Sequence, residues 1–171
     1  MKIKFLLLLS LILITILAGC SKESHNKNIL DNNNGFQNTL EKDDFEITIT
    51  TERNTYSLNK LFKTEPLNIS ALIKYIGNKE NISIWHGEPL CAITLVPCNG
   101  DSFGESFLDI KIRSIIQKDE AILISPDFQS EFYKDRITKG EYTAIAHLKL
   151  SLDKKGTQIV DFSAEIPFEI Q

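Results

Sequence analysis

The sequence has few of the residues that build catalytic and metal sites. Among 171 residues there are three cysteines, three histidines and eight glycines, and no C-x-x-C or H-x-x-x-H spacing. Compact zinc sites use such spacings, and phosphate-binding loops need clustered glycines. The G-x-S-x-G elbow of α/β hydrolases is also missing. We therefore expect no cofactor and no enzymatic activity.

Basic residues are also scarce. The chain has 19 Lys and Arg against 23 Asp and Glu, and its formal net charge is −4. Lys2 and Lys4 lie at the N-terminus, so the remaining chain has 17 basic and 23 acidic residues. A nucleic-acid-binding surface needs clustered Lys and Arg to neutralise phosphates. We expect no nucleic-acid partner, and no attraction of the body to an anionic membrane by charge alone.

The one long hydrophobic run is confined to the N-terminus. Lys2 and Lys4 precede "FLLLLSLILITILAG", which carries no charge and ends at Cys20. A basic start, an apolar stretch of roughly 15 residues and small residues at its end are typical of a secretory signal. A membrane-spanning helix needs about 20 apolar residues, so the run is short for a permanent span.

The segment Leu17-Ala18-Gly19-Cys20 resembles the lipobox of bacterial lipoproteins. The resemblance implies that residues 1–19 are removed and that Cys20 receives a diacylglyceryl group on its sulfur. Acyl chains fix a protein to a membrane because each buried methylene adds about 0.8 kcal/mol. We expect the protein on the cell membrane, held by this lipid and facing the extracytoplasmic side. The alternatives are an uncleaved signal anchor and a chance cysteine at the end of a cleaved signal.

The next segment is polar and shows no hydrophobic period. Residues 21–44 read "SKESHNKNILDNNNGFQNTLEKDD", rich in Asn, Asp, Lys and Ser. Such a composition buries too little apolar surface to offset the entropy of ordering. We predict a disordered tether over residues 20–44 and one folded domain over residues 45–171, which is long enough for one core.

Alternating apolar and polar residues recur through the body, as in β-strands that cover a core on one face. Two long alternating runs flank the short turn "DKKGT" and predict an antiparallel hairpin. Only "SLNKLFKTE" and "SPDFQSEFYKDR" suggest helix, of one or two turns. The pattern predicts an all-β fold, an immunoglobulin-like antiparallel sandwich of seven to eight strands. The expected strands cover residues 45–50, 67–75, 81–86, 90–96, 107–116, 142–152 and 160–170.

Tyr142 follows a glycine turn in "ITKGEY" and opens a predicted strand. In immunoglobulin-like sandwiches a tyrosine at this corner bonds its hydroxyl to nearby backbone. The alternative is an ordinary core aromatic.

Two resemblances cover the body. "YIGNKENISIWHGEPL", a glycine turn and "ITKGEYTA" resemble small lipid-anchored extracytoplasmic proteins of Gram-positive bacteria, largely without assigned function. The order of strands is similar to that of the intracellular proteinase-inhibitor family, whose fold is an immunoglobulin-like sandwich. No inhibitory loop is recognisable, so the second resemblance implies the fold and not inhibition.

The stretch "SIWHGEPLCAITLVPCNG" collects several reactive residue types. His86, Cys91 and Cys98 are ligand types that suit zinc, with His147 as a conceivable fourth. Their spacing fits no compact metal site, and His147 is expected on the exposed face of its strand. We predict no metal.

Cys91 and Cys98 form an even pair once Cys20 carries lipid, and export permits oxidation. On one straight strand they would stand roughly 20 Å apart on opposite faces, whereas a disulfide needs Cα atoms within about 7 Å. A bridge therefore requires a bend. Without one, Cys91 is a buried small residue and Cys98 lies in a loop.

Trp85, the only tryptophan, is out of phase with Ile82 and Ile84. We expect it to close the edge of the core; the alternative is that it faces a partner. A recognition surface, if present, is expected at Trp85, His86 and the loop 99–107, because a sandwich displays its loops at its ends.

The sequence thus predicts a lipid-anchored envelope protein whose sandwich is a binding or scaffold module for an unknown envelope protein. The competing hypothesis is an envelope metal-binding protein or enzyme that uses His86 with Cys91 or Cys98.

Overall fold

The computed structural model describes residues 26–30 and 36–171. The predicted signal peptide, residues 1–19, and the predicted lipid attachment site, Cys20, lie outside these residues. No helix in the described part of the chain has the length and apolar character needed to cross a bilayer.

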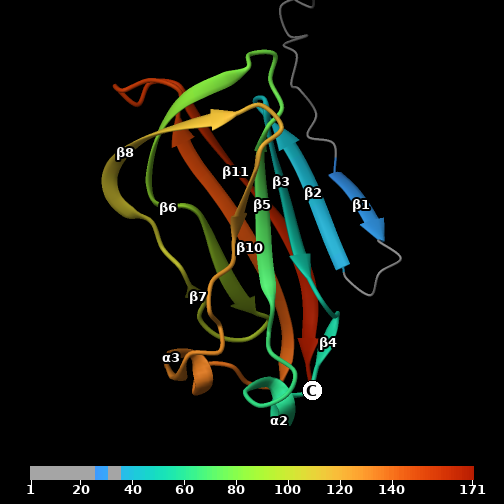
Figure 1. Cartoon of the computed structure of the whole chain (residues 1–171). Helices are drawn as coiled ribbons and strands as arrows, with labels where there is room; N and C mark the ends of the chain where they lie inside the picture. Colours follow the sequence, from blue (N-terminus) through green and yellow to red (C-terminus); the bar gives the residue numbers. More distant parts are fainter. Residues whose placement is uncertain (1–25, 31–35) are drawn as a thin grey trace, which may run out of the picture.

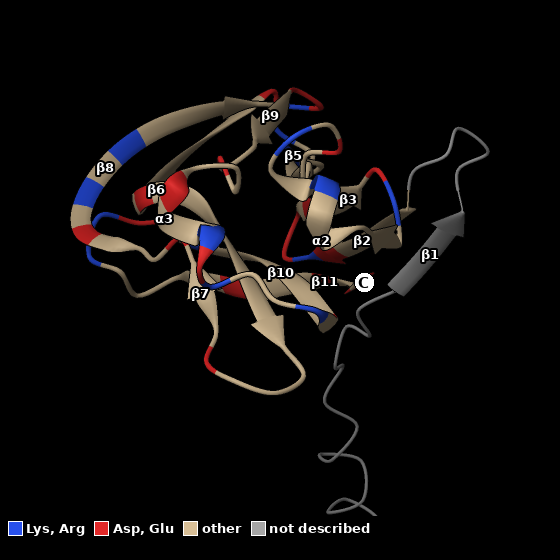
Figure 2. Ribbon diagram, turned by 90° about the horizontal axis from the view of Figure 1, so that it is seen from below, with Lys and Arg blue, Asp and Glu red and all other residues tan. Residues whose placement is uncertain are grey.

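The described chain folds into two stacked β-sheets (Figure 1). Within residues 26–30 and 36–171, helical structure is limited to the single turns α2 (Leu58–Leu61) and α3 (Glu131–Lys134). Seen from below in Figure 2, β5, β3 and β2 form one layer above β10 and β11. The prediction of an all-β sandwich is confirmed.

The first sheet has the strand order β1-β2-β3-β5-β9, with every neighbouring pair antiparallel. Its strands are β1 (Asn26–Leu30), β2 (Phe36–Lys42), β3 (Phe45–Thr51), β5 (Ile69–Tyr75) and β9 (Ala121–Ile124).

The second sheet has the order β4-β11-β10-β6-β7, and β8 pairs with the first half of β6. The long β10–β11 hairpin at its centre is antiparallel, as the sequence predicts, and only the short β4 runs parallel to its neighbour β11. Its strands are β4 (Thr55–Tyr56), β6 (Asn81–Pro97), β7 (Phe103–Gly104), β8 (Leu108–Gln117), β10 (Gly140–Ser151) and β11 (Ile159–Ile170).

The ordered sheet begins earlier than the sequence predicts. The expected tether, residues 20–44, contains β1 and all of β2, and β2 pairs with β3 along its whole length. Phe36 and Leu40 pack against the core, and the Asn38 side chain donates to Glu165 O at 2.7 Å. The boundary at residue 44 is therefore wrong. The many polar residues concealed a period of two that becomes visible once β3 supplies a partner.

The core lies between the sheets because alternate residues of each long strand point inward. In β3 and β5 the inward rows are completely buried, and in β10 and β11 every second residue is buried. Large fully buried side chains include Phe45, Ile47, Ile73, Ile93 and Phe128. The described residues form eleven strands rather than seven or eight. Five strands, β1, β2, β4, β7 and β9, add to the predicted set, and the predicted segments 81–86 and 90–96 merge into β6.

Tyr142 fixes the entry of β10. Its hydroxyl accepts from the Thr138 backbone N–H (3.0 Å) and donates to the Thr138 carbonyl (2.9 Å), while its ring is buried and stacks on Phe168. The predicted bond from the corner tyrosine to nearby backbone is therefore present.

Candidate binding groove

The outer face of the second sheet forms the floor of the groove. Along β10 and β11 the even-numbered residues point into the core, so Lys149 and Ile159 point outward. Ile84 of β6 is fully buried, and the next residue, Trp85, turns to the same outer face. Trp85 pairs with Ser151, which pairs with Ile159. Three strands thus place side chains on one outer surface.

Strand β8 forms one wall because it bends over this face at its first residues. Its register with β6 shifts between His86 and Glu88. At the shift, Gly87 approaches the β8 backbone so closely that a Cβ on it would lie 2.6 Å from Leu108 O. Phe107, just before β8, makes an edge contact with His147 on β10 (5.3 Å between ring centroids).

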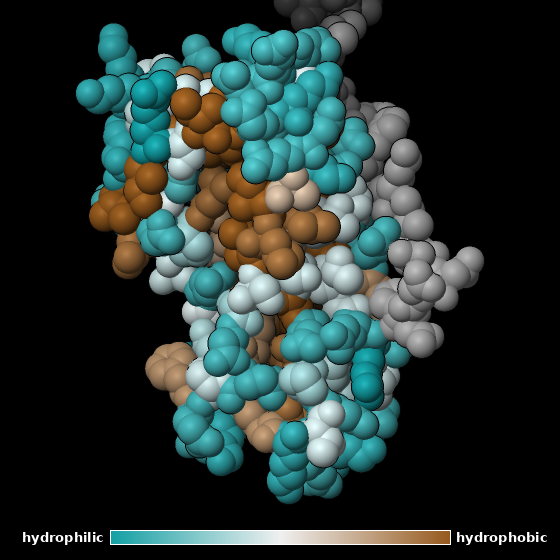
Figure 3. Space-filling view, in the orientation of Figure 1, coloured by the Kyte–Doolittle hydropathy of each residue, from teal (hydrophilic) through white to brown (hydrophobic). Residues whose placement is uncertain are grey.

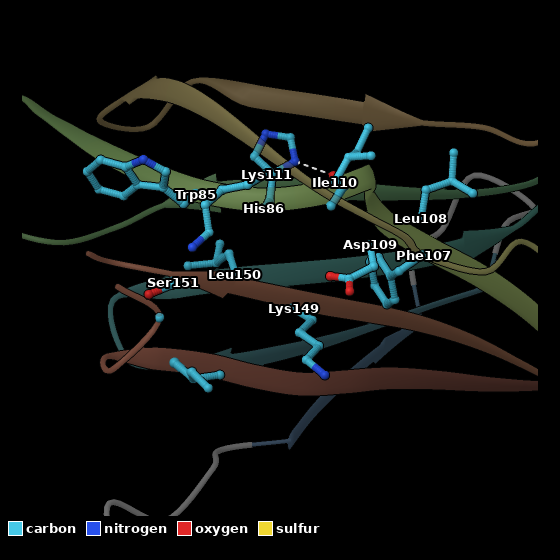
Figure 4. Close-up of a pocket in the computed structure, with 13 residues that line it drawn as sticks. Trp85, His86, Phe107, Leu108, Asp109, Ile110, Lys111, Lys149, Leu150 and Ser151 are labelled. Atoms are coloured by element: carbon cyan, nitrogen blue, oxygen red, sulfur yellow. Dashed lines mark hydrogen bonds between the residues drawn. The ribbon is translucent and has the colours of Figure 1, made fainter. Parts of the chain in front are cut away.

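The Lys111 ammonium links β8 to the opposite wall by donating to Lys154 O at 2.7 Å in the β10–β11 turn. Between the two walls is a groove of about 550 Å³. Figure 4 shows its lining side chains. Residues from β6, β8, β10, β11 and their loops line it: Trp85, His86, Gly87, Phe107, Leu108, Asp109, Ile110, Lys111, Lys149, Leu150, Ser151, Gly156 and Ile159.

The groove exposes large apolar side chains. Leu108 is 58% exposed, Ile110 49% and Ile159 56%. The described residues contain only six large hydrophobic side chains exposed to this degree, and three of them line this groove. The other three, Ile115, Leu123 and Phe132, lie outside it. In Figure 3, hydrophobic side chains also gather at the left edge of the molecule, over β8, and in the middle, over β5 and β9.

Trp85 does not close the core, so the favoured sequence interpretation is wrong. It is half-buried, lines the groove and carries the Arg113 guanidinium over its ring, 5.8 Å from the centroid. Such a cation–π contact stabilises the partly buried indole in this position. Trp85 instead lies on the groove, and the alternative, in which it faces a partner, stays a prediction.

His86 ties the two strands of the wall together. Its Nδ1 lies 2.6 Å from Gly87 O and its Nε2 lies 2.8 Å from Ser114 Oγ (Figure 4 marks the first contact). A carbonyl only accepts, so Nδ1 carries the proton and Nε2 accepts from the serine hydroxyl. Both ring nitrogens have protein partners. His86 therefore supports the groove rather than offering a free ligand.

The structure does not bring His86, Cys91 and Cys98 together. Cys91 is fully buried in the core, Cys98 is exposed beyond the end of β6, and both are free. The sequence left a disulfide open on condition of a bend, and the bend is absent, because β6 continues without a hairpin from Asn81 to Pro97. Burial raises the pKa of the Cys91 thiol to about 12. Within the described residues, no group of three or more His, Cys, Asp and Glu side chains is arranged to hold a metal ion.

The loop 99–107 contributes only its last residue, Phe107, to the groove. Phe103 of the same loop is buried and lies against Tyr142 at the other end of β10. Sequence reasoning missed Lys111, Lys149 and Ile159. The available signal was Ile159, an apolar residue directly before the alternating row that begins at Val160.

Comparisons with family models, with curated proteins and with solved structures find no match to this chain.

Proposed function

We propose that this chain is a lipoprotein of the extracytoplasmic membrane face, anchored through Cys20, whose β-sandwich binds an envelope protein. The lipobox-like segment before Cys20 supports the anchor. Anchoring concentrates the sandwich at the membrane surface, so that even a modest affinity for a neighbouring protein is effective. We also propose that the chain belongs with the small lipoproteins of Gram-positive bacteria that its sequence resembles. We propose no nucleic-acid partner for it.

The groove on the second sheet is the observation that carries the binding role. Exposed apolar side chains that gather at one concavity are typical of ligand or partner sites, whereas isolated ones are ordinary. Here Leu108, Ile110 and Ile159 surround one concavity together with a fixed indole. A rigid sheet supports the groove floor, and the Lys111 bridge joins its walls. Concave apolar sites with a few polar groups are the usual form of binding sites.

Replacing Cys20 tests the anchor. We expect Cys20→Ser to abolish lipid attachment, so that the chain leaves the membrane fraction or keeps residues 1–19. The matched control is Cys98→Ser, which removes an exposed thiol elsewhere and is expected to leave membrane retention and mass unchanged. Membrane fractionation and intact mass provide the measurement. Retention of Cys20→Ser in the membrane with the mass of the wild-type mature chain would refute the anchor.

A further inference from the structure

The loop between β6 and β7 contains the pair Asn99-Gly100, which takes no part in the groove. Within the described residues, Asn99 is the one asparagine that precedes a glycine. The other such pair of the sequence, Asn34-Gly35, lies outside the described residues. An asparagine at this position can react with its own backbone, because the amide nitrogen of the next residue and the side-chain carbonyl carbon can close a succinimide ring.

The attacking nitrogen, that of the Gly100 peptide bond, is not held by the sheet. The last backbone bond before it joins the Cys98 N–H to the Glu141 carbonyl at 2.9 Å. Within the part of the chain that the structure describes, the Gly100 N–H donates to no backbone carbonyl. Asn99 and Gly100 are both exposed, so water reaches the side-chain amide and the nitrogen alike.

Gly100 also leaves room for the ring to close. Its φ is +123°, in the region that favours glycine. A Cβ on Gly100 would meet only the Pro97 side chain, at 3.6 Å. At Gly87, by contrast, a Cβ would lie 2.6 Å from a backbone oxygen. The backbone nitrogen of Gly100 is therefore crowded neither by a side chain of its own residue nor by its surroundings.

We propose that Asn99 is a site of spontaneous deamidation. The Gly100 nitrogen forms a bond to the Asn99 side-chain carbonyl carbon, the bond from that carbon to Nδ2 breaks, and ammonia leaves with the proton of the Gly100 N–H. Water then adds to one of the two ring carbonyls, the bond from that carbonyl to the ring nitrogen breaks, and the nitrogen regains a proton. Residue 99 becomes aspartate or isoaspartate. Water is the co-reactant, and no electrons are transferred.

The product carboxylate lies at a small hollow of about 320 Å³, which Asn99 lines together with Asp101 and Arg136. Arg136 forms no ion pair within residues 26–30 and 36–171, and its guanidinium stands over the Phe132 ring, 5.0 Å from the centroid. It is a cation available to the new carboxylate. Each molecule reacts once at this site, so the converted fraction rises with the age of the protein.

Peptide mapping by mass spectrometry tests the proposal. The full chain, purified from membranes in mild detergent, is incubated at neutral and at mildly alkaline pH, and samples are digested at mildly acidic pH, where the reaction is slow. The matched site is Asn78, which is also exposed in a loop but precedes Lys79. We expect Asn99 to convert at least about tenfold faster than Asn78, because glycine leaves the attacking nitrogen unshielded. The rate at Asn99 should rise with pH, because that nitrogen must lose its proton, and isoaspartate should form beside aspartate.

Two variants make the test specific. Gly100→Ala should slow conversion at Asn99 at least about tenfold, since the added Cβ shields the nitrogen. Conversion at Asn78 should stay unchanged in this variant, which shows that the fold is intact. Asn99→Asp supplies the reference for the aspartate product.

Three results would overturn the proposal: conversion at Asn99 no faster than at Asn78, conversion that Gly100→Ala does not slow, or formation of aspartate without isoaspartate. The last result would mean direct hydrolysis without the ring. The proposal goes beyond the proposed function and does not depend on it, because the tests of the anchor and of the groove do not involve residue 99.

Discussion

At the scale of single residues, the local environments of the two body cysteines, of Tyr142 and of Asp153 determine how these side chains behave. Cys91 is buried in the core, whereas Cys98 lies exposed beyond the end of β6. The ring of Tyr142 is buried, and its hydroxyl both accepts a hydrogen bond from the Thr138 N–H and donates one to the Thr138 carbonyl. Asp153 accepts from four donors in the β10–β11 turn. Each environment has a measurable consequence.

The two body cysteines should differ sharply in reactivity. The thiolate is the reacting form, and with a pKa of about 12 the Cys91 thiol ionises in about one molecule in 10⁵ at pH 7. We expect a thiol reagent to label Cys98 in the native chain and Cys91 only after denaturation. Peptide mapping by mass spectrometry measures both sites, and equal labelling of the two in the native chain would contradict the structure.

Replacing Tyr142 by Phe should destabilise the sandwich by about 1 kcal/mol, because the Thr138 N–H and carbonyl lose their hydrogen-bond partner. The loss stays modest because Thr138 is exposed, so that water can replace the missing hydroxyl. Urea unfolding gives the difference. The control is Tyr133→Phe, whose hydroxyl bonds no other group within the described residues, and which should change stability by less than about 0.5 kcal/mol. Equal losses for both variants would argue against the corner bond.

Asp153 should make the stability depend on acid pH. Hydrogen bonds from the Thr157 side chain and from the backbone of Thr157, Gly156 and Lys155 lower the pKa of its carboxyl. A lowered folded-state pKa gives stability that is complete above the ordinary value near 4 and is lost as the pH falls through the folded-state pKa. Asp153→Asn should flatten this part of the curve of unfolding free energy against pH. An unchanged slope would contradict the assignment.

At the scale of elements, the close approach of β6 and β8 at Gly87 shapes the groove. Gly87→Ala would place a Cβ 2.6 Å from Leu108 O, so β8 must move away. We expect a loss of about 1–3 kcal/mol in unfolding free energy and a shift of the Trp85 emission. Asn81→Ala, at the exposed start of the same strand, is the control and should cost less than about 0.5 kcal/mol. Wild-type stability and emission in Gly87→Ala would show that the contact is not required.

The long strands could be predicted from sequence because their inward rows keep a period of two over many residues. The segment 45–50 falls within β3, and the segment 142–152 matches β10 except for its last residue. Segments 81–86 and 90–96 are one strand, β6, because Gly87 and its neighbours continue the ladder instead of turning. The pattern did not reveal β2, whose inward row includes Asn38.

The groove was only half predictable. Trp85 and His86 stood out as unusual residues, but their partners come from β8, β10 and β11, which are distant in sequence. Whether an outward residue stands alone or borders a groove depends on how the sheet bends, and that bend follows from the register shifts of β6 against β8 and β10. An alternating sequence shows which face of the sheet each side chain occupies, but it does not show how the sheet curves.

At the scale of the whole molecule, the start of the described chain and the groove lie on different sheets. The described chain begins at β1, the outermost strand of the first sheet. The groove lies on the outer face of the second sheet, on the other side of the core. A chain tethered through its N-terminus can therefore keep the groove open toward its surroundings.

Site-specific photo-crosslinking on intact cells tests this account most directly. A photoreactive side chain replaces Ile159 in the groove or, as the matched control, Phe132 on α3, which is also hydrophobic and is more exposed, at 66%. The account predicts a discrete crosslinked envelope protein from position 159 and none from position 132. The same adduct from both positions, or an adduct from position 132 alone, would contradict it.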